Sequence, residues 1–254
     1  MFIGAFGDSF LYGSDFDDCN DDAGIASQKT YPALIANKLN GTCINFSVPG
    51  CGNKYIADQI CKCIQINKDK VFYLINWSWI DRHDYVVEDS QGKLQKPRTI
   101  FDYVTYNNFQ NKWATILPGA STKISKFYYK ELHHQYNDKL ENLLVINSTL
   151  SLLKNNNCNY LMTFMDYLLL DTEFYNTSSI TLLQDTCKPD LKSYSGYNFL
   201  DWSKHNNYLI SQNWHPLEEA HQAAAEYWLP KVRTLLNSSA KEESHASIRK
   251  FHNG

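Results

Sequence analysis

The sequence opens with MFIGAFGDSF at residues 1–10, and this stretch decides the fold. Its apolar residues are followed at once by Gly-Asp-Ser, a pattern typical of a buried strand that ends in a tight turn. Ser9 would then lie just past the carboxyl end of that strand, where open α/β sheets place their functional residues. The stretch therefore predicts an α/β protein with a candidate nucleophile at its first strand.

A second stretch near the other end of the chain supplies the chemistry that Ser9 would need. A serine hydroxyl is a poor nucleophile until a base accepts its proton, and a histidine is the usual base. His215 lies in the sequence NWHP at residues 213–216, directly before a helical pattern. Together, Ser9 and His215 suggest a hydrolase.

Strand and helix patterns alternate between these two ends. Such alternation implies right-handed crossovers and a doubly wound, mainly parallel sheet. After the opening strand, the patterns predict strands at 42–46, 71–77 and 159–165 and helices at about 30–39 and 54–66. They also predict one long helix, or two with a kink, at 124–153, and a last helix from 216 until Pro230 interrupts it.

The length of 254 residues allows one large α/β domain or two small ones. No internal repeat or low-complexity tract argues for a second domain. We expect a single domain over residues 1–237, with irregular insertions at about 78–122 and 168–210. Residues 238–254 show no core-forming pattern and are predicted to be a mobile tail.

Composition argues against several classes of partner. The net charge of −3 and the charged fraction of 20% do not indicate a nucleic-acid-binding surface. No run approaches the roughly 18 apolar residues that a membrane span needs. The seven cysteines lack the usual zinc-site spacing, so no metal is expected. The start of the chain lacks a signal-peptide pattern, which favours a cytoplasmic location and leaves a virion protein as an alternative.

Three separated blocks resemble the SGNH hydrolases, also called GDSL esterases. The sequence FGDS at residues 6–9 is similar to the first family block, with Ser9 in the nucleophile position. Asn45 and Gly50 are similar to the second block, in which a glycine N–H helps to form the oxyanion hole. His215-Pro216 before a helix is similar to the fifth block, whose histidine is the general base.

The resemblance implies a flavodoxin-like, three-layer α/β/α sandwich with a mainly parallel sheet of about five strands. It also implies a serine esterase that needs neither a metal nor an organic cofactor. In the family's mechanism the oxyanion would be held by the N–H groups of Ser9 and Gly50 and by one side chain from the third block. Asp8 is expected to hydrogen-bond the backbone of its own turn, and His221 is expected to be structural.

Two blocks depart from the family pattern. The third block reads Asn76-Trp77-Ser78-Trp79 without the usual Asn-Asp pair, so Ser78, or alternatively Asn76, would be the side-chain oxyanion donor. The fifth block usually has an aspartate three residues before the histidine, where this chain has Gln212. A backbone carbonyl could orient His215 instead, Asp166 could supply the carboxylate, or the site could be inactive.

The substrate class follows from the resemblance and from composition. The family cleaves acyl and acetyl esters, and the Tyr- and Trp-rich stretch at 78–122 would suit a sugar face. We therefore expect a small-molecule or glycan ester as the substrate. Two alternatives stay open: a catalytically inactive, glycan-binding or structural module, for example in a virus particle, and an acyltransferase that uses the same site.

Overall fold

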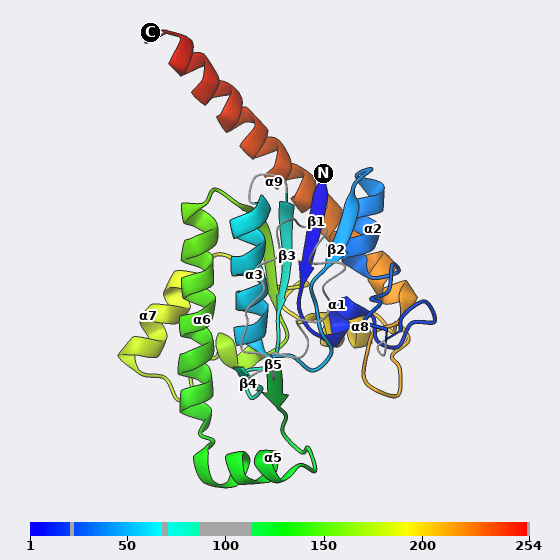
Figure 1. Cartoon of the computed structure of the whole chain (residues 1–254), viewed down its shortest axis with the longest axis vertical. Coiled ribbons are helices and arrows are strands. Elements are labelled where there is room, and N and C mark those ends of the chain that lie inside the picture. Colours follow the sequence, from blue (N-terminus) through cyan, green and yellow to red (C-terminus); the bar gives the residue numbers. More distant parts are fainter. Residues whose placement is uncertain (21–22, 68–70, 87–112, 253–254) are drawn as a thin grey trace, which may run out of the picture.

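A five-stranded parallel sheet forms the centre of the molecule, in a computed structural model that describes residues 1–20, 23–67, 71–86 and 113–252 (Figure 1). The strands lie in the order β2-β1-β3-β6-β7, which is the flavodoxin-like order. The mainly parallel sheet of about five strands that the sequence predicts is thus confirmed. The strand bounds are Phe2–Phe6 (β1), Thr42–Asn45 (β2), Val71–Trp77 (β3), Asn159–Phe164 (β6) and Leu191–Lys192 (β7).

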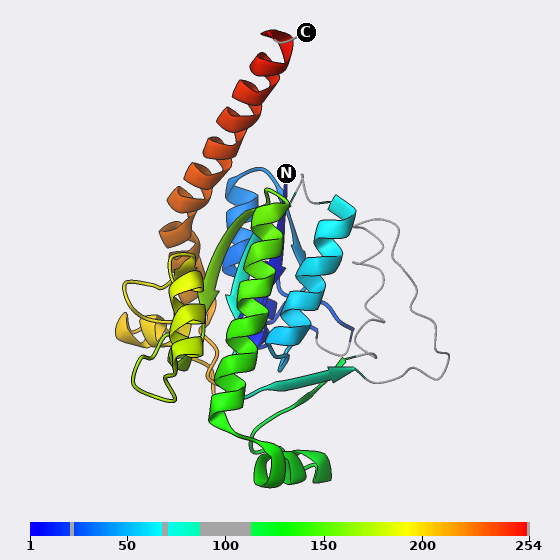
Figure 2. The same cartoon turned by 90° about the vertical axis from the view of Figure 1, so that its left-hand side faces the viewer.

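Helices cover both faces of the sheet and complete the three layers (Figures 1 and 2). One face packs against α2 (Tyr31–Lys38), α8 (Phe199–His205) and α9 (Glu218–His252). The other packs against α3 (Asn53–Asn67), α6 (Gln135–Asn155) and α7 (Ser178–Cys187). The predicted crossover pattern is therefore present, because successive parallel strands are joined by helices.

The central strand β3 shows why the sheet is buried on both sides. All seven of its residues are buried, as expected for an inner parallel strand. Tyr73 and Ile75 belong to the core beneath α3 and α6, whereas Phe72 and Leu74 belong to the core beneath α2 and α9. This alternation places apolar side chains in both layers at once.

The predicted insertions contain more regular structure than the sequence indicated. The stretch at 168–210 was predicted to be irregular, but it carries α7, β7 and α8. At 78–122, the strands β4 (His83–Val86) and β5 (Trp113–Ile116) pair antiparallel, and residues 87–112 lie outside the described part. Figure 2 shows this hairpin beyond the end of the sheet where the β1 and β3 arrows point.

Of the two alternatives for the pattern from 124 onward, the structure has the divided helix, and the end of the last predicted helix is corrected. The pattern from 124 onward divides into α5 (Lys123–Phe127), a π-helical turn at Tyr128–Leu132 and α6. Pro230 does not interrupt the last helix, because α9 continues to His252. The mobility of residues 238–254 stays a prediction. Figure 1 shows the distal part of α9 projecting away from the sheet. Among the described residues, no helix is both long and apolar enough to cross a membrane.

Candidate active site

The turn after β1 presents Ser9 at the carboxyl end of the sheet. Asp8 caps the short helix α1 (Ser9–Tyr12), since its Oδ1 accepts a hydrogen bond of 3.1 Å from the Phe10 N–H. This confirms the prediction that Asp8 bonds the backbone of its own turn. A Cβ on Gly7 would lie 3.2 Å from the carbonyl oxygen of Asn76, so the chain needs a glycine there to pass so close to β3.

Ser9 and His215 are brought together from opposite ends of the chain. The distance from Ser9 Oγ to His215 Nε2 is 2.8 Å, and that from His215 Nδ1 to Asp15 Oδ2 is also 2.8 Å. An ionised carboxylate can only accept, so Nδ1 carries the proton and Nε2 is left to accept the hydrogen of Ser9. The three side chains form a hydrogen-bonded chain that runs from a hydroxyl through an imidazole to a carboxylate.

Asp15 is the site residue that sequence reasoning missed. It lies in the loop after α1 and is held by the side chains of Ser211 and Asn213, which flank Gln212 on the histidine loop. Burial alone would raise the pKa of Asp15, but hydrogen bonds from Ser211, Asn213 and His215 outweigh it and lower the pKa. The carboxylate is thus kept ionised beside the imidazole.

Asp166, the carboxylate predicted to support His215, forms hydrogen bonds with backbone N–H groups instead. Its Oδ2 accepts a hydrogen bond of 3.1 Å from the Ile80 N–H, and its Oδ1 accepts one of 2.9 Å from the Leu168 N–H. It therefore caps the 3₁₀ turn Tyr167–Leu169 at the end of β6. The acid expected at this site is replaced by Asp15, and Gln212 is exposed.

Two backbone N–H groups near Ser9 are free to bind a ligand. Gly50 has a φ of 77° and lies in a turn that is closed by a hydrogen bond from Cys51 N–H to the Val48 carbonyl. Among the described residues, neither the Gly50 N–H nor the Ser9 N–H donates a hydrogen bond to the protein. Glycine adopts this positive φ without the strain that a side chain adds, which fits the position predicted for an oxyanion donor.

Both side chains predicted as the third oxyanion donor are buried. The Ser78 hydroxyl donates to Asp8 Oδ2 at 2.7 Å and accepts from Arg82 at 2.8 Å. Asn76 is 1% exposed, and its Oδ1 accepts from the Thr163 hydroxyl. The hydrogen of the Ser78 hydroxyl is thus used by Asp8, whereas Asn76 Nδ2 has no hydrogen-bond partner among the described residues, and the choice of a third oxyanion donor stays a prediction.

A largely buried ion pair between Arg82 and Asp8 connects the turns that form the site. Arg82 Nη1 lies 2.9 Å from Asp8 Oδ2 and 3.0 Å from the carbonyl oxygen of Cys51. The guanidinium thereby ties the serine turn to the Gly50 turn and to the end of β3. Removing one partner of such a pair costs about 3–5 kcal/mol of stability, since a charge is left buried alone.

His221 behaves as the structural histidine that the sequence predicted. It is 1% exposed, its Nδ1 accepts a hydrogen bond of 3.0 Å from the Tyr31 N–H, and its ring packs edge-on against Phe16 and Phe199. Burial, followed by the nearby charge of His215, lowers the pKa of His221 to about 3. The neutral ring therefore belongs to the core.

The depressed pKa of His221 predicts a loss of stability in mild acid. The unfolded chain protonates this histidine near pH 6.5, whereas the folded chain does so only near pH 3. Stability is therefore complete above about pH 6.5 and falls as the pH drops towards 3, by on the order of 2 kcal/mol at pH 5. Urea unfolding of the wild type and His221→Gln between pH 7.5 and 4.5 measures this.

The variant should show a flatter dependence of unfolding free energy on pH than the wild type. His205→Gln is the matched control, because His205 is exposed and should leave the slope unchanged. Equal slopes for the wild type and His221→Gln would contradict the assignment.

Comparisons with known proteins bear on the fold. No protein-family model matches the sequence, and no curated protein matches it. A member of the lipolytic G-D-S-L family from Veillonella parvula is similar at 11% identity and a TM-score of 0.43, covering 91% of this chain and 97% of its own. The esterase EstA from Pseudoalteromonas sp. has 11% identity and a TM-score of 0.41, with 96% and 98% covered.

A third solved structure is longer than this chain. The acetyl xylan esterase Est2A from Butyrivibrio proteoclasticus has 13% identity and a TM-score of 0.44, and the match covers 93% of this chain but 64% of that one.

Proposed function

We propose that the protein is a serine hydrolase that cleaves an acyl ester, with Ser9 as nucleophile, His215 as base and Asp15 as orienting acid. The observation that carries the proposal is the unbroken chain of hydrogen bonds from Ser9 Oγ through the imidazole to Asp15. Such an arrangement activates a hydroxyl that is otherwise a weak nucleophile. Ser9 is 7% exposed, in a turn at the edge of the sheet where ligands of this fold class bind.

In the acylation step, Ser9 Oγ attacks the ester carbonyl carbon while its proton moves to His215 Nε2. The carbonyl oxygen becomes an oxyanion, and the free N–H groups of Ser9 and Gly50 are the donors that we assign to it. Donors of this kind face charge that appears only in the transition state, and each is worth about 10²–10³ in rate. The intermediate then collapses, the carbon–oxygen bond to the alcohol breaks, and Nε2 returns the proton to the leaving oxygen.

In the deacylation step, water replaces the alcohol. His215 Nε2 takes a proton from the water, whose oxygen attacks the carbonyl carbon of the acyl-enzyme. The bond to Ser9 Oγ breaks, the proton returns to Ser9, and a carboxylic acid is released. Asp15 stays ionised throughout and stabilises the imidazolium that forms in both steps.

The contact of Asp15 with His215 weakens the case for an inactive binding module. That alternative depended on Gln212 in the place of the family's acid, and Asp15 provides a carboxylate from a different loop. Acyl transfer would use the same three residues with an alcohol in place of water. The stretch at 78–122 was expected to suit a sugar face, and most of it, residues 87–112, lies outside the described part of the chain.

A covalent label tests the proposal without knowledge of the natural substrate. A fluorophosphonate mimics the tetrahedral intermediate and reacts only with an activated hydroxyl. We expect mass spectrometry of the purified protein to show one adduct, on the peptide that contains Ser9, and no adduct after mutation of His215 to alanine. Absence of labelling at Ser9 in the wild type would contradict the proposed function.

A further inference from the structure

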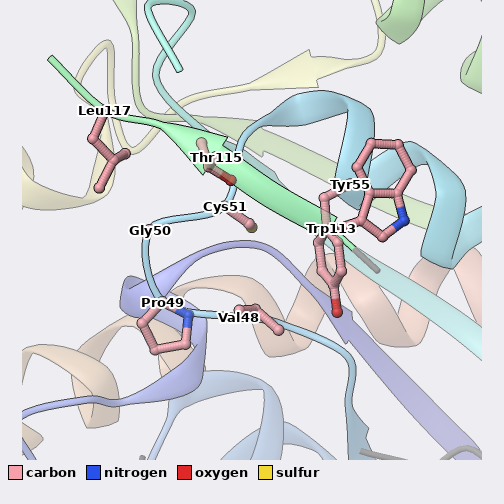
Figure 3. A pocket seen from close by; sticks show the side chains of 8 residues that line it. All are labelled: Val48, Pro49, Gly50, Cys51, Tyr55, Trp113, Thr115 and Leu117. Carbon is pink, nitrogen blue, oxygen red and sulfur yellow. The ribbon is translucent and has the colours of Figure 1, made fainter. Parts of the chain in front are cut away.

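A pocket of about 200 Å³ lies beside the Gly50 turn (Figure 3). Figure 3 shows Gly50 and Leu117 at one end and the rings of Tyr55 and Trp113 at the other. The walls come from the glycine turn, the start of α3 and the strand β5. The lining residues are Val48, Pro49, Gly50, Cys51, Tyr55, Trp113, Thr115 and Leu117.

The pocket adjoins the oxyanion donor that we assign. A Cβ placed on Gly50 would lie 3.6 Å from Leu117 Cδ1, so this leucine sits against the turn that presents the Gly50 N–H. The same turn is fastened to the serine turn, because Val48 N–H and Cys51 Sγ both donate to the Gly7 carbonyl, at 3.2 Å each. A group held at the oxyanion hole would therefore have this pocket next to it.

The walls of the pocket are held in place from behind by two carboxylates. Asp84 is 4% exposed and accepts hydrogen bonds from Gly52 N–H at 2.8 Å, Tyr55 N–H at 2.9 Å and Thr115 Oγ1 at 2.6 Å. Asp58 accepts from Trp113 Nε1 at 3.0 Å. The polar atoms of Thr115 and Trp113 are thus already paired, and the pocket is preformed rather than shaped by its ligand.

The lining and the size define what fits. None of the described residues that line the pocket is charged, so a carboxylate or ammonium group would lose its hydration there without a partner among them. A closed apolar cavity of about 150 Å³ binds a benzene ring, so a pocket of about 200 Å³ holds roughly six carbon atoms. An acetyl group would leave most of it empty.

We propose that this pocket binds the acyl chain of the ester, and that it selects uncharged, medium-length acyl groups of about four to six carbons. The inference rests on the proposed function for the position of the carbonyl. It makes Trp113, in the strand β5 outside the central sheet, and Leu117, directly after that strand, the residues that set chain length. The alcohol part of the ester would bind outside this pocket.

A chain-length series tests this proposal. We expect kcat/KM on p-nitrophenyl esters to rise from acetate to butyrate or hexanoate and to fall at decanoate. Leu117→Phe should shift the optimum towards acetate, because the larger ring fills the pocket beside Gly50. Leu117→Ala should shift it towards longer chains. The matched controls are Leu182→Phe and Leu182→Ala, since Leu182 is exposed on α7 and should leave the profile unchanged.

A binding measurement separates this inference from the proposed function. Saturation-transfer NMR with hexanoate on Ser9→Ala needs no turnover, and we expect contact from the acyl methyl that Leu117→Phe abolishes. If no variant or wild-type sample hydrolyses esters but this contact is found, the proposed function fails and the acyl pocket stands. If esters are hydrolysed but the Leu117 variants keep the wild-type chain-length profile, the acyl-pocket inference is overturned and the proposed function stands. If hydrolysis and hexanoate contact are both absent, both proposals fail.

Discussion

Replacing Ser9 with alanine is expected to lower kcat for ester hydrolysis by about 10⁶-fold, as removal of the nucleophile does in other serine hydrolases. The alanine lacks the oxygen that attacks the carbonyl, so no acyl-enzyme can form. The hydrogen bond to His215 Nε2 is lost as well. Initial rates with p-nitrophenyl butyrate, measured at saturating substrate for the wild type and the variant, give the ratio.

The fold of Ser9→Ala should be intact, because the change removes one oxygen and keeps the hydrogen bond that Phe10 N–H donates to Asp8 Oδ1. Circular dichroism and urea unfolding check this. Ser179→Ala is the matched control, since Ser179 is exposed on α7 and should keep full activity. Turnover by Ser9→Ala within tenfold of the wild type would remove Ser9 from the nucleophile role.

Replacing Asp15 with asparagine is expected to lower kcat by about 10⁴-fold, the cost of the corresponding change in other triads. An amide can donate to Nδ1, which would leave the proton on Nε2 and place the imidazole in the wrong tautomer to accept from Ser9. The amide also carries no charge to stabilise the imidazolium. The volume and shape of the side chain are almost unchanged, so the free energy of unfolding should change little while kcat falls.

Asp17→Asn is the matched control for Asp15→Asn. Asp17 lies two residues away and forms an exposed ion pair with Lys29 at 2.6 Å, and exposed pairs contribute little. We expect this control to hydrolyse esters at the wild-type rate. A fall of less than tenfold in Asp15→Asn would mean that His215 is oriented without a carboxylate, as a backbone carbonyl could do.

The α/β class, four of the five strands of the sheet and the contact partners Ser9 and His215 were predictable from the sequence. Apolar runs such as 71–77 report burial directly, because an inner parallel strand is covered on both faces. Ser9 and His215 each lie beside a recognisable element end, Ser9 after the first strand and His215 before the last helix. Local pattern was sufficient there because it marks where an element stops. The short strand β7 and the helix α8 have too few residues for a periodic pattern to reveal them.

Only the tertiary structure decided the acid and the interior partners of the site. Asp15 lies 200 residues from His215 in the chain, in an Asp-rich loop whose acids are indistinguishable by local pattern. The side chains of Ser211 and Asn213 hydrogen-bond to Asp15. The N–H groups of Ile80 and Leu168 hydrogen-bond to Asp166. The contacts from Ser211, Asn213 and Ile80 join segments that are distant in the sequence, so they form only in the folded chain. Ser78 likewise faces inward because Asp8 and Arg82 are buried beside it. The pattern of apolar residues along a chain predicts where helices and strands lie. Which of several similar aspartates contacts the histidine depends on how the loops pack in the folded structure.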